Sequence, residues 1–234
     1  YFFNEVIDLS LSREYCIENS LPYLAKDGTL RNVDCFRETA LNYKEKGRYS
    51  NFPVGSEDYF RFWDSERNKC KDGITLGQLK IPGKFYFFLN FFSMIIAENE
   101  EGDEVRTLPN FWFVHFNFFH LINYCDKYKT DLSLIKPRSV GLSESAASVG
   151  TYDYFIIELD STNKPKFKSN TFYASDERYL KGDDGIFYKM TKAIEWLNEN
   201  GEGAMMKELT HTMDNSKMHW VAGHRKNDGS KKQT

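Results

Sequence analysis

Hydroxyls, a glycine and two cations gather in the segment Lys136–Ser143, K-P-R-S-V-G-L-S. The apolar run Asp131–Ile135 comes before it, and the alanine-rich segment Glu144–Val149 comes after it. This pattern predicts a strand, a loop and a helix in that order. Phosphate binding needs such an arrangement, because loop amides and the positive end of a helix dipole both point at the anion while a cation neutralises it. The segment is therefore our candidate phosphate-binding loop.

The candidate loop departs from the standard phosphate-loop pattern, in which a lysine follows the second glycine and precedes a hydroxyl residue. Gly141 and Ser143 stand at the expected positions of the glycine and of the Mg²⁺ ligand, but Leu142 occupies the place of the lysine. A cation stands instead at the start of the loop, as Lys136. A generic pattern alone therefore identifies this loop only weakly.

The pattern K-x-R-x-V-G-x-S resembles the deviant phosphate loop of the large terminase subunits of tailed bacteriophages, in which the lysine has moved to the start of the loop. Other stretches are similar to the same family and follow in the same order. They are Tyr49–Trp63 with Cys70–Gly73, Ile81–Asn90, Leu108–Trp112 ahead of an aromatic helix, and Ala174–Leu180 ahead of the amphipathic segment Met190–Asn198. The resemblance extends from about residue 35 to about residue 200.

This resemblance implies a role for each residue of the loop. Lys136 would contact the β- and γ-phosphates of ATP, and Ser143 would hold Mg²⁺. Arg138 would stabilise charge on the transferred phosphoryl group, and a salt-bridged surface arginine is the alternative interpretation. The backbone amides that would cradle the phosphates belong to Ser139, Val140, Gly141, Leu142 and Ser143.

A base-binding residue is expected upstream of the loop, because members of the terminase family carry their base contacts there. Tyr86 or Phe87 would stack on the adenine ring. Packing within the core is the alternative for either ring.

The family also implies an apolar strand that ends in Asp-Glu, whose Asp helps to hold Mg²⁺ and whose Glu activates water. Phe155–Asp160 begins twelve residues after Ser143, which is too close for a helical crossover to a parallel strand. We therefore interpret it as the end of a helix and a following strand or loop. No better candidate precedes Thr234, so we expect a truncated chain that hydrolyses ATP slowly or not at all in isolation.

The function implied by the resemblance is that of an ATPase in a viral DNA-packaging motor, with ATP and Mg²⁺ as cofactors. The implied partners are double-stranded DNA, a portal protein, a small terminase subunit and further copies of the chain in a ring, without a membrane. The implied location is the cytoplasm of an infected bacterial host. Two alternatives stay open: a non-catalytic nucleic-acid- or capsid-binding module with a degenerate loop, and a helicase-like ATPase, which lacks supporting motifs.

The elements that would position the loop are predicted from hydrophobic periodicity. Residues 1–75 predict a helical region, in which the apolar positions of Val33–Lys46 recur at spacings of three and four and Gly47 ends the helix. Ser56 is expected to cap a second helix, which Gly73 closes. The residues expected on its inward face are Tyr59, Phe60 and Trp63. Residues 76–234 would form the ATPase core, a three-layer α/β phosphate-loop NTPase-like fold with a parallel sheet.

Two aromatic segments belong to this predicted core. Phe85–Ala97 is shorter than the ~20 residues of a membrane span, so we interpret it as a buried helix or a strand running into one, with membrane insertion as the weaker alternative. Leu108–Tyr124 predicts a helix buried on most sides. His115 and His120, five residues apart, do not share a helix face, so we interpret them as core or surface residues rather than a metal pair.

Composition limits the remaining possibilities. The chain has 234 residues, 41% of them hydrophobic, and a formal net charge of -3. DNA contact would therefore need a local basic patch; the tail His219–Thr234 is one candidate, and a solvated tail is the favoured alternative. The four cysteines form no C-x-x-C pair, which argues against a zinc site and favours reduced thiols in a reducing cytoplasm.

Overall fold

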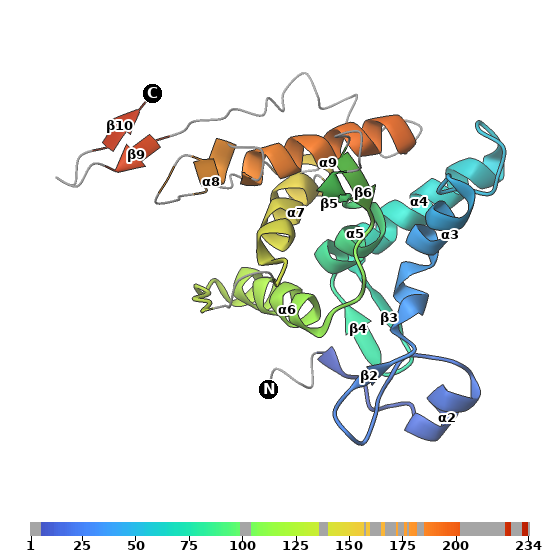
Figure 1. Ribbon diagram of the computed structural model, residues 1–234. Helices are drawn as coiled ribbons and strands as arrows, with labels where there is room; N and C mark the ends of the chain where they lie inside the picture. The colour runs from blue at the N-terminus through green and yellow to red at the C-terminus, as the bar shows by residue number, and fades with distance from the viewer. Residues whose placement is uncertain are drawn as a thin grey trace. The chain divides into compact units, whose positions relative to one another are not determined.

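The computed structural model describes residues 6–98, 104–135, 140–156, 158–159, 165–166, 172, 176, 178–181, 185–201, 223–225 and 231–233. The chain divides into two compact units, and Figure 1 labels their helices and strands. The first comprises Tyr1–Phe92 and Leu108–Ser145, and the second comprises Ser93–Thr107 and Ala146–Thr234. The boundary predicted between residues 75 and 76 falls inside a strand of the first unit.

Helices and two short hairpins make up the described part of the first unit. Its elements are α2 (Arg13–Glu18), β1 (Tyr23–Leu24), β2 (Leu30–Arg31), the 3-10 helix η1 (Val33–Arg37), α3 (Glu38–Lys46), α4 (Glu57–Asp72), β3 (Ile74–Leu76), β4 (Leu79–Ile81), α5 (Gly83–Phe91) and α6 (Phe113–Tyr128). Helix α7 (Leu142–Phe155) begins in this unit and continues into the second. The second unit also contains β5 (Met94–Glu98), β6 (Glu104–Thr107), β7 (Glu158–Leu159), β8 (Pro165–Lys166), α8 (Arg178–Lys181), α9 (Ile186–Asn200), β9 (Gly223–Arg225) and β10 (Lys231–Gln233).

Every strand pair in these ranges is an antiparallel two-stranded hairpin between neighbours in the sequence. The parallel sheet of the predicted three-layer core is not among them and stays a prediction. Helix α7 ends at Phe155, and β7 then pairs with β8. The described residues of this segment, 155–156 and 158–159, thus agree with its interpretation as the end of a helix and a following strand or loop.

Helices α3 and α4 form where the periodicity places them. The predicted helix over Val33–Lys46 is present as η1 and α3, and Gly47 ends it in the left-handed conformation, with φ 68°. The Ser56 hydroxyl caps α4 by accepting a hydrogen bond from the Tyr59 amide at 3.2 Å. Tyr59 and Trp63 are buried as predicted, but Phe60 is 39% exposed, so its inward placement is wrong. The buried stripe of α4 recurs every three to four residues, and Phe60 lies about 100° from Tyr59 around the helix axis.

Two aromatic helices, α5 and α6, contribute much of the core of the first unit. The run Phe85–Ala97 contains a helix that precedes a strand, α5 and then β5, the reverse of one predicted order. Every residue of α5 from Phe85 to Phe91 is buried. The Phe119 ring of α6 lies 5.2 Å, centroid to centroid, from the rings of both Phe85 and Phe88. Within the described ranges, no helix combines the length and hydropathy that a bilayer crossing requires.

A buried carboxylate joins α3, α4 and α5. Glu66 of α4 is 1% exposed, and an unpaired charge at such a position is strongly destabilising. Its carboxylate accepts hydrogen bonds from the Thr39 hydroxyl at 3.0 Å and the Tyr86 hydroxyl at 2.7 Å, and Lys69 Nζ lies at 2.6 Å. Burial raises the pKa of Tyr86, and the nearby Glu66 charge adds to this effect. The Tyr86 hydroxyl therefore stays protonated and donates.

A second buried polar group, Asn90 of α5, completes the junction with α3. The first amides of a helix have no acceptor within the helix, and no side chain next to the start of α3 caps it. The Asn90 Oδ1 atom accepts a hydrogen bond from the Ala40 amide at 3.1 Å, while its Nδ2 donates to the Phe36 carbonyl at 2.9 Å. A side chain fifty residues away in the sequence thus caps this helix.

We expect Tyr86→Phe to lower the free energy of unfolding by about 1–3 kcal/mol, because the Glu66 carboxylate loses one of its donors while the ring volume is kept. Denaturant unfolding measures the change. Tyr15→Phe is the matched control, because Tyr15 is 48% exposed. Equal stability of the two variants would contradict the role given to the Tyr86 hydroxyl.

Stability should also depend on pH through His120. Burial lowers its pKa to about 4 from the ordinary value of 6.5, so between these pH values the unfolded chain binds a proton that the folded chain does not. The free energy of unfolding should therefore fall as the pH falls from about 6.5 to about 4, by about 3 kcal/mol at most. Urea unfolding of the wild type and of His120→Gln at several pH values checks this. The same pH dependence in both proteins would exclude His120 as the cause.

Candidate functional site

The end of the candidate loop forms the start of α7. Gly141 has a φ of 71°, in the left-handed region that favours glycine, and α7 begins at the next residue. The Gly141 carbonyl accepts hydrogen bonds from the Ser145 amide at 3.1 Å and from the Ser145 hydroxyl at 3.3 Å. The helix predicted after the loop is confirmed, and its first-turn amides follow the glycine directly.

His115 of α6 contacts the backbone directly before this glycine. It is buried, and its Nε2 atom lies 3.2 Å from the Val140 carbonyl oxygen. Since a carbonyl only accepts, the Nε2–H tautomer donates this bond. Burial lowers the pKa of His115, an effect that the bond to Val140 opposes. The neutral ring therefore positions Val140 and Gly141 without adding charge at neutral pH.

An exposed tryptophan, Trp112, packs against His115. The Trp112 ring stacks on the His115 ring, with centroids 5.4 Å apart and planes 21° apart. On another side His115 meets the Phe88 ring edge-on at 5.0 Å. Trp112 is 50% exposed, so a flat aromatic surface faces solvent one ring away from the loop.

The residues predicted for the loop are only partly described. Lys136, Arg138 and Ser139 lie outside the described residues, and their assigned roles stay predictions. Within the described part, Ser143 is exposed in the first turn of α7, where a hydroxyl can reach a ligand. The Leu142 side chain is buried, which leaves its backbone amide as the group available to a phosphate.

The strand predicted before the loop is not formed. Asp131–Ile135 belong to neither a helix nor a strand, and the Ile135 side chain is fully exposed. A strand needs a neighbour to satisfy its amides and carbonyls, and none of the described strand pairs includes this segment. The described residues therefore support the helical half of the phosphate-loop pattern and not its strand.

Tyr86, the predicted adenine contact, lies in the core. It is 4% exposed, and its hydroxyl is bonded to Glu66 rather than to the loop. The packing alternative thus describes its position, while adenine stacking by this ring stays a prediction. The sequence did not single out His115 and Trp112 for the loop; the only signal was Trp112 in the stretch Leu108–Trp112.

Among the described residues, no group of three or more His, Cys, Asp or Glu side chains is arranged to hold a metal ion. His115 and His120 are both buried, and the His120 ring packs 4.5 Å from the Phe116 ring. Of the two predicted placements, core or surface, both histidines therefore take the core. Ser143 as a Mg²⁺ ligand stays a prediction.

Comparison of the chain with protein-family models, with curated proteins and with solved structures gave no match. A helix start after a left-handed glycine, with an exposed hydroxyl in the first turn, suits an anion.

Gly141→Ala should destabilise the first unit through two effects. The left-handed conformation costs a non-glycine residue about 1–2 kcal/mol, and the new Cβ would lie 2.8 Å from His115 Nε2. Gly47→Ala is the matched control, because Gly47 has a φ of 68° and open space around its would-be Cβ. Thermal unfolding should show the larger loss for Gly141→Ala. Equal losses of stability in the two variants would show that the contact with His115 adds no cost to the substitution at Gly141.

Proposed function

We propose that this chain is the ATP-binding part of a viral DNA-packaging motor of the large-terminase type. The observation that carries the proposal is the position of Ser143, exposed in the first turn of a helix that begins directly after the left-handed Gly141. This is the geometry that a phosphate and its Mg²⁺ ion require of the second half of a phosphate loop. It coincides with the segment that resembles the terminase loop in sequence.

In this proposal the start of α7 holds the terminal phosphates of ATP. The amides of Leu142 and Ser143, in the first turn of the helix, lack acceptors within it and donate to the phosphate oxygens. Lys136 supplies the balancing charge, Ser143 binds Mg²⁺, and Arg138 stabilises the transferred phosphoryl group. His115 keeps the loop in place through Val140.

Trp112 is the better candidate for the base. Its ring is half exposed and stacks on the histidine that contacts the loop, whereas the Tyr86 ring is enclosed. Stacking of a nucleobase on an aromatic side chain contributes about 1–3 kcal/mol. We therefore assign adenine contact to Trp112 in place of Tyr86.

The motor's wider context belongs to the same proposal. Double-stranded DNA, a portal protein, a small terminase subunit and a ring of further copies are the partners, and the host cytoplasm is the location. ATP hydrolysis in the assembled motor would need an acidic motif, which none of the described residues supplies.

A second candidate function is a non-catalytic nucleic-acid- or capsid-binding module with a degenerate loop. The absence of a strand at Asp131–Ile135 favours it. So does the buried Leu142 at the position where a standard loop carries its lysine. The two candidates differ in a single measurable property, the binding of nucleotide.

Mg²⁺-ATP should stabilise the chain against thermal unfolding. A ligand at a hundred times its Kd adds about 2.7 kcal/mol, and we expect Lys136→Ala to abolish that gain. Lys26→Ala, an exposed lysine in the hairpin region, is the control and should keep it. An unmoved melting curve of the wild type would favour the non-catalytic module.

Trp112→Ala should weaken the binding of ATP by about tenfold or more, because the base loses its stacking surface. Binding of inorganic triphosphate should be unchanged, since that ligand has no base. Phe113→Ala, also exposed and next in the sequence, is the control for loss of a surface ring. Isothermal titration of each variant with both ligands distinguishes the effects. Equal weakening for both ligands would point to a structural role for Trp112.

A further inference from the structure

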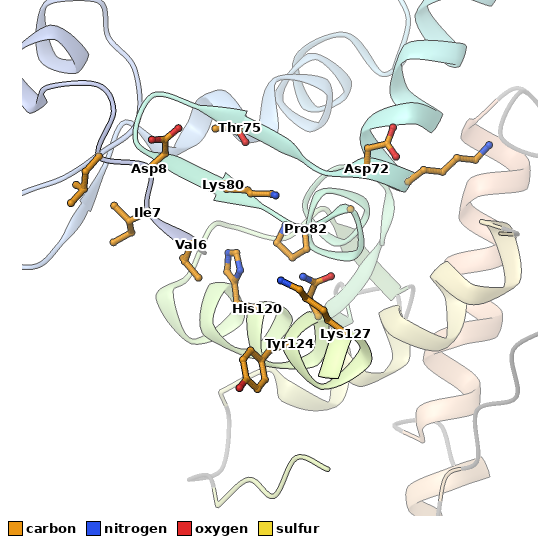
Figure 2. Close-up of a pocket in the computed structure, with 14 residues that line it drawn as sticks. Val6, Ile7, Asp8, Asp72, Thr75, Lys80, Pro82, His120, Tyr124 and Lys127 are labelled. Atoms are coloured by element: carbon orange, nitrogen blue, oxygen red, sulfur yellow. The ribbon is translucent and has the colours of Figure 1, made fainter. Parts of the chain in front are cut away.

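A cavity lies in the first unit, apart from the candidate loop. It has a volume of about 820 Å³, and its wall is formed by the N-terminal segment, the β3–β4 hairpin with the α4 and α5 ends beside it, and the last turns of α6 (Figure 2). The N-terminal side is held in place by the Asp8 amide, which donates to the Gln78 carbonyl at 2.8 Å, and by a bridge between Ile7 and Leu79. An ion pair of 2.5 Å also joins α5 to α6, between Lys84 and Asp126, neither of which lines the cavity. The cavity is therefore built from elements that are fastened together.

Lysines dominate the charge of this cavity. Lys71 at the end of α4, Lys80 in β4 and Lys127 in α6 all line it, and all three are exposed. Figure 2 shows the Lys80 and Lys127 side chains extending toward the space beside Pro82 and His120. Lysine ammonium groups bind phosphate as point charges with three donors each. Elements distant in the sequence thus bring separate cations to one space.

Two aspartates also line the cavity but do not cancel its charge. Asp8 and Asp72 lie at opposite ends of the pocket in the view of Figure 2. Hydrogen bonds from the Ser10 side chain and from the Ser10 amide, the latter at 2.9 Å to Asp8 Oδ1, lower the pKa of Asp8. Three lysines against two aspartates leave the lining cationic. Neutral donors, Thr75 and Asn123, line it as well.

Helix α6 separates this cavity from the loop. His115 contacts the loop, whereas His120 lines the cavity. Five residues along a helix correspond to a rise of about 7–8 Å and a rotation of about 140° beyond one full turn. The cavity and the candidate loop therefore lie against different faces of one helix and can be occupied together.

We propose that this cavity is a second anion site, which binds phosphate groups through Lys80 and Lys127 with Lys71 at its rim. The volume of about 820 Å³ exceeds that of a single phosphate, so an occupant with several phosphate groups, or with a sugar and base besides, fits the cavity. That chemistry is shared by the backbone of a nucleic acid and by a free pyrophosphate-bearing ligand. The site does not depend on ATP binding at the start of α7.

The test measures binding to the full chain carrying Lys136→Ala and without Mg²⁺, so that the candidate loop does not contribute. Inorganic pyrophosphate, followed by titration calorimetry, and a short fluorescent DNA duplex, followed by anisotropy, are the two probes. Lys80→Ala/Lys127→Ala is added to remove the site. Lys26→Ala/Lys44→Ala removes the same charge from exposed positions outside the cavity and is the matched control.

Loss of Lys80 and Lys127 should weaken pyrophosphate binding by about tenfold or more, while the control pair leaves it unchanged. If the backbone of DNA is the natural source, the slope of log K against log salt for the duplex should also fall by about 2, since about 0.9 is lost per phosphate contact. An effect on pyrophosphate alone would identify a free ligand. The proposal is overturned if neither probe binds, or if the cavity pair and the control pair bind alike.

Two further measurements keep the result interpretable. Thermal unfolding checks that the cavity variant is folded, and Lys80→Gln/Lys127→Gln, which keeps the side-chain length, replaces it if the alanine pair is unstable. Without Lys136→Ala, the cavity pair should retain any stabilisation by Mg²⁺-ATP. The failure of the nucleotide proposal and the failure of this one are therefore seen in different experiments.

Discussion

The Glu66 carboxylate is the group on which the arrangement of the first unit depends. Aromatic contacts between α4, α5 and α6 are numerous, but each depends less steeply on distance and angle than a hydrogen bond to a buried charge does. A buried charge tolerates little movement of the helices, because each donor must stay within hydrogen-bond distance. Thr39 and Tyr86 reach Glu66 from α3 and α5. These directional bonds set the register in which the aromatic rings then pack.

Helix α6 connects this core to the candidate loop and to the lysine-lined cavity. Its apolar face packs on α5 through Phe119, and its polar atoms lie at the edges of this contact. His115 meets the Val140 carbonyl, and His120 forms part of the cavity wall. Both imidazoles are buried, so each is held at a fixed place. The candidate loop and the lysine-lined cavity thus share one support, although their residues are far apart in the sequence.

Local sequence signals, such as capping residues and apolar spacing, predicted many of the helices. Contacts between segments distant in the sequence could not be predicted from such signals. The Ser56 cap, the Gly47 end of α3, the buried Trp63 and the amphipathic segment now seen as α9 follow from spacing and capping. Phe60 was misplaced because adjacent aromatic residues overfill the apolar stripe of α4. The apolar run at Asp131–Ile135 fits a strand locally, but only a partner segment makes a strand. No local pattern relates His115 to Gly141, because their contact spans two elements.

The amide of Ala40 finds its acceptor on Asn90, in a different helix, and this makes α3 a dependent element. Most helices carry their own N-terminal cap and can begin to form before they dock. Packing of α5 against α3 supplies the acceptor that this first-turn amide would otherwise find only in water. We therefore expect a peptide of residues 33–46 to be largely unfolded in water and to gain its helix when the segment that contains Asn90 packs against it.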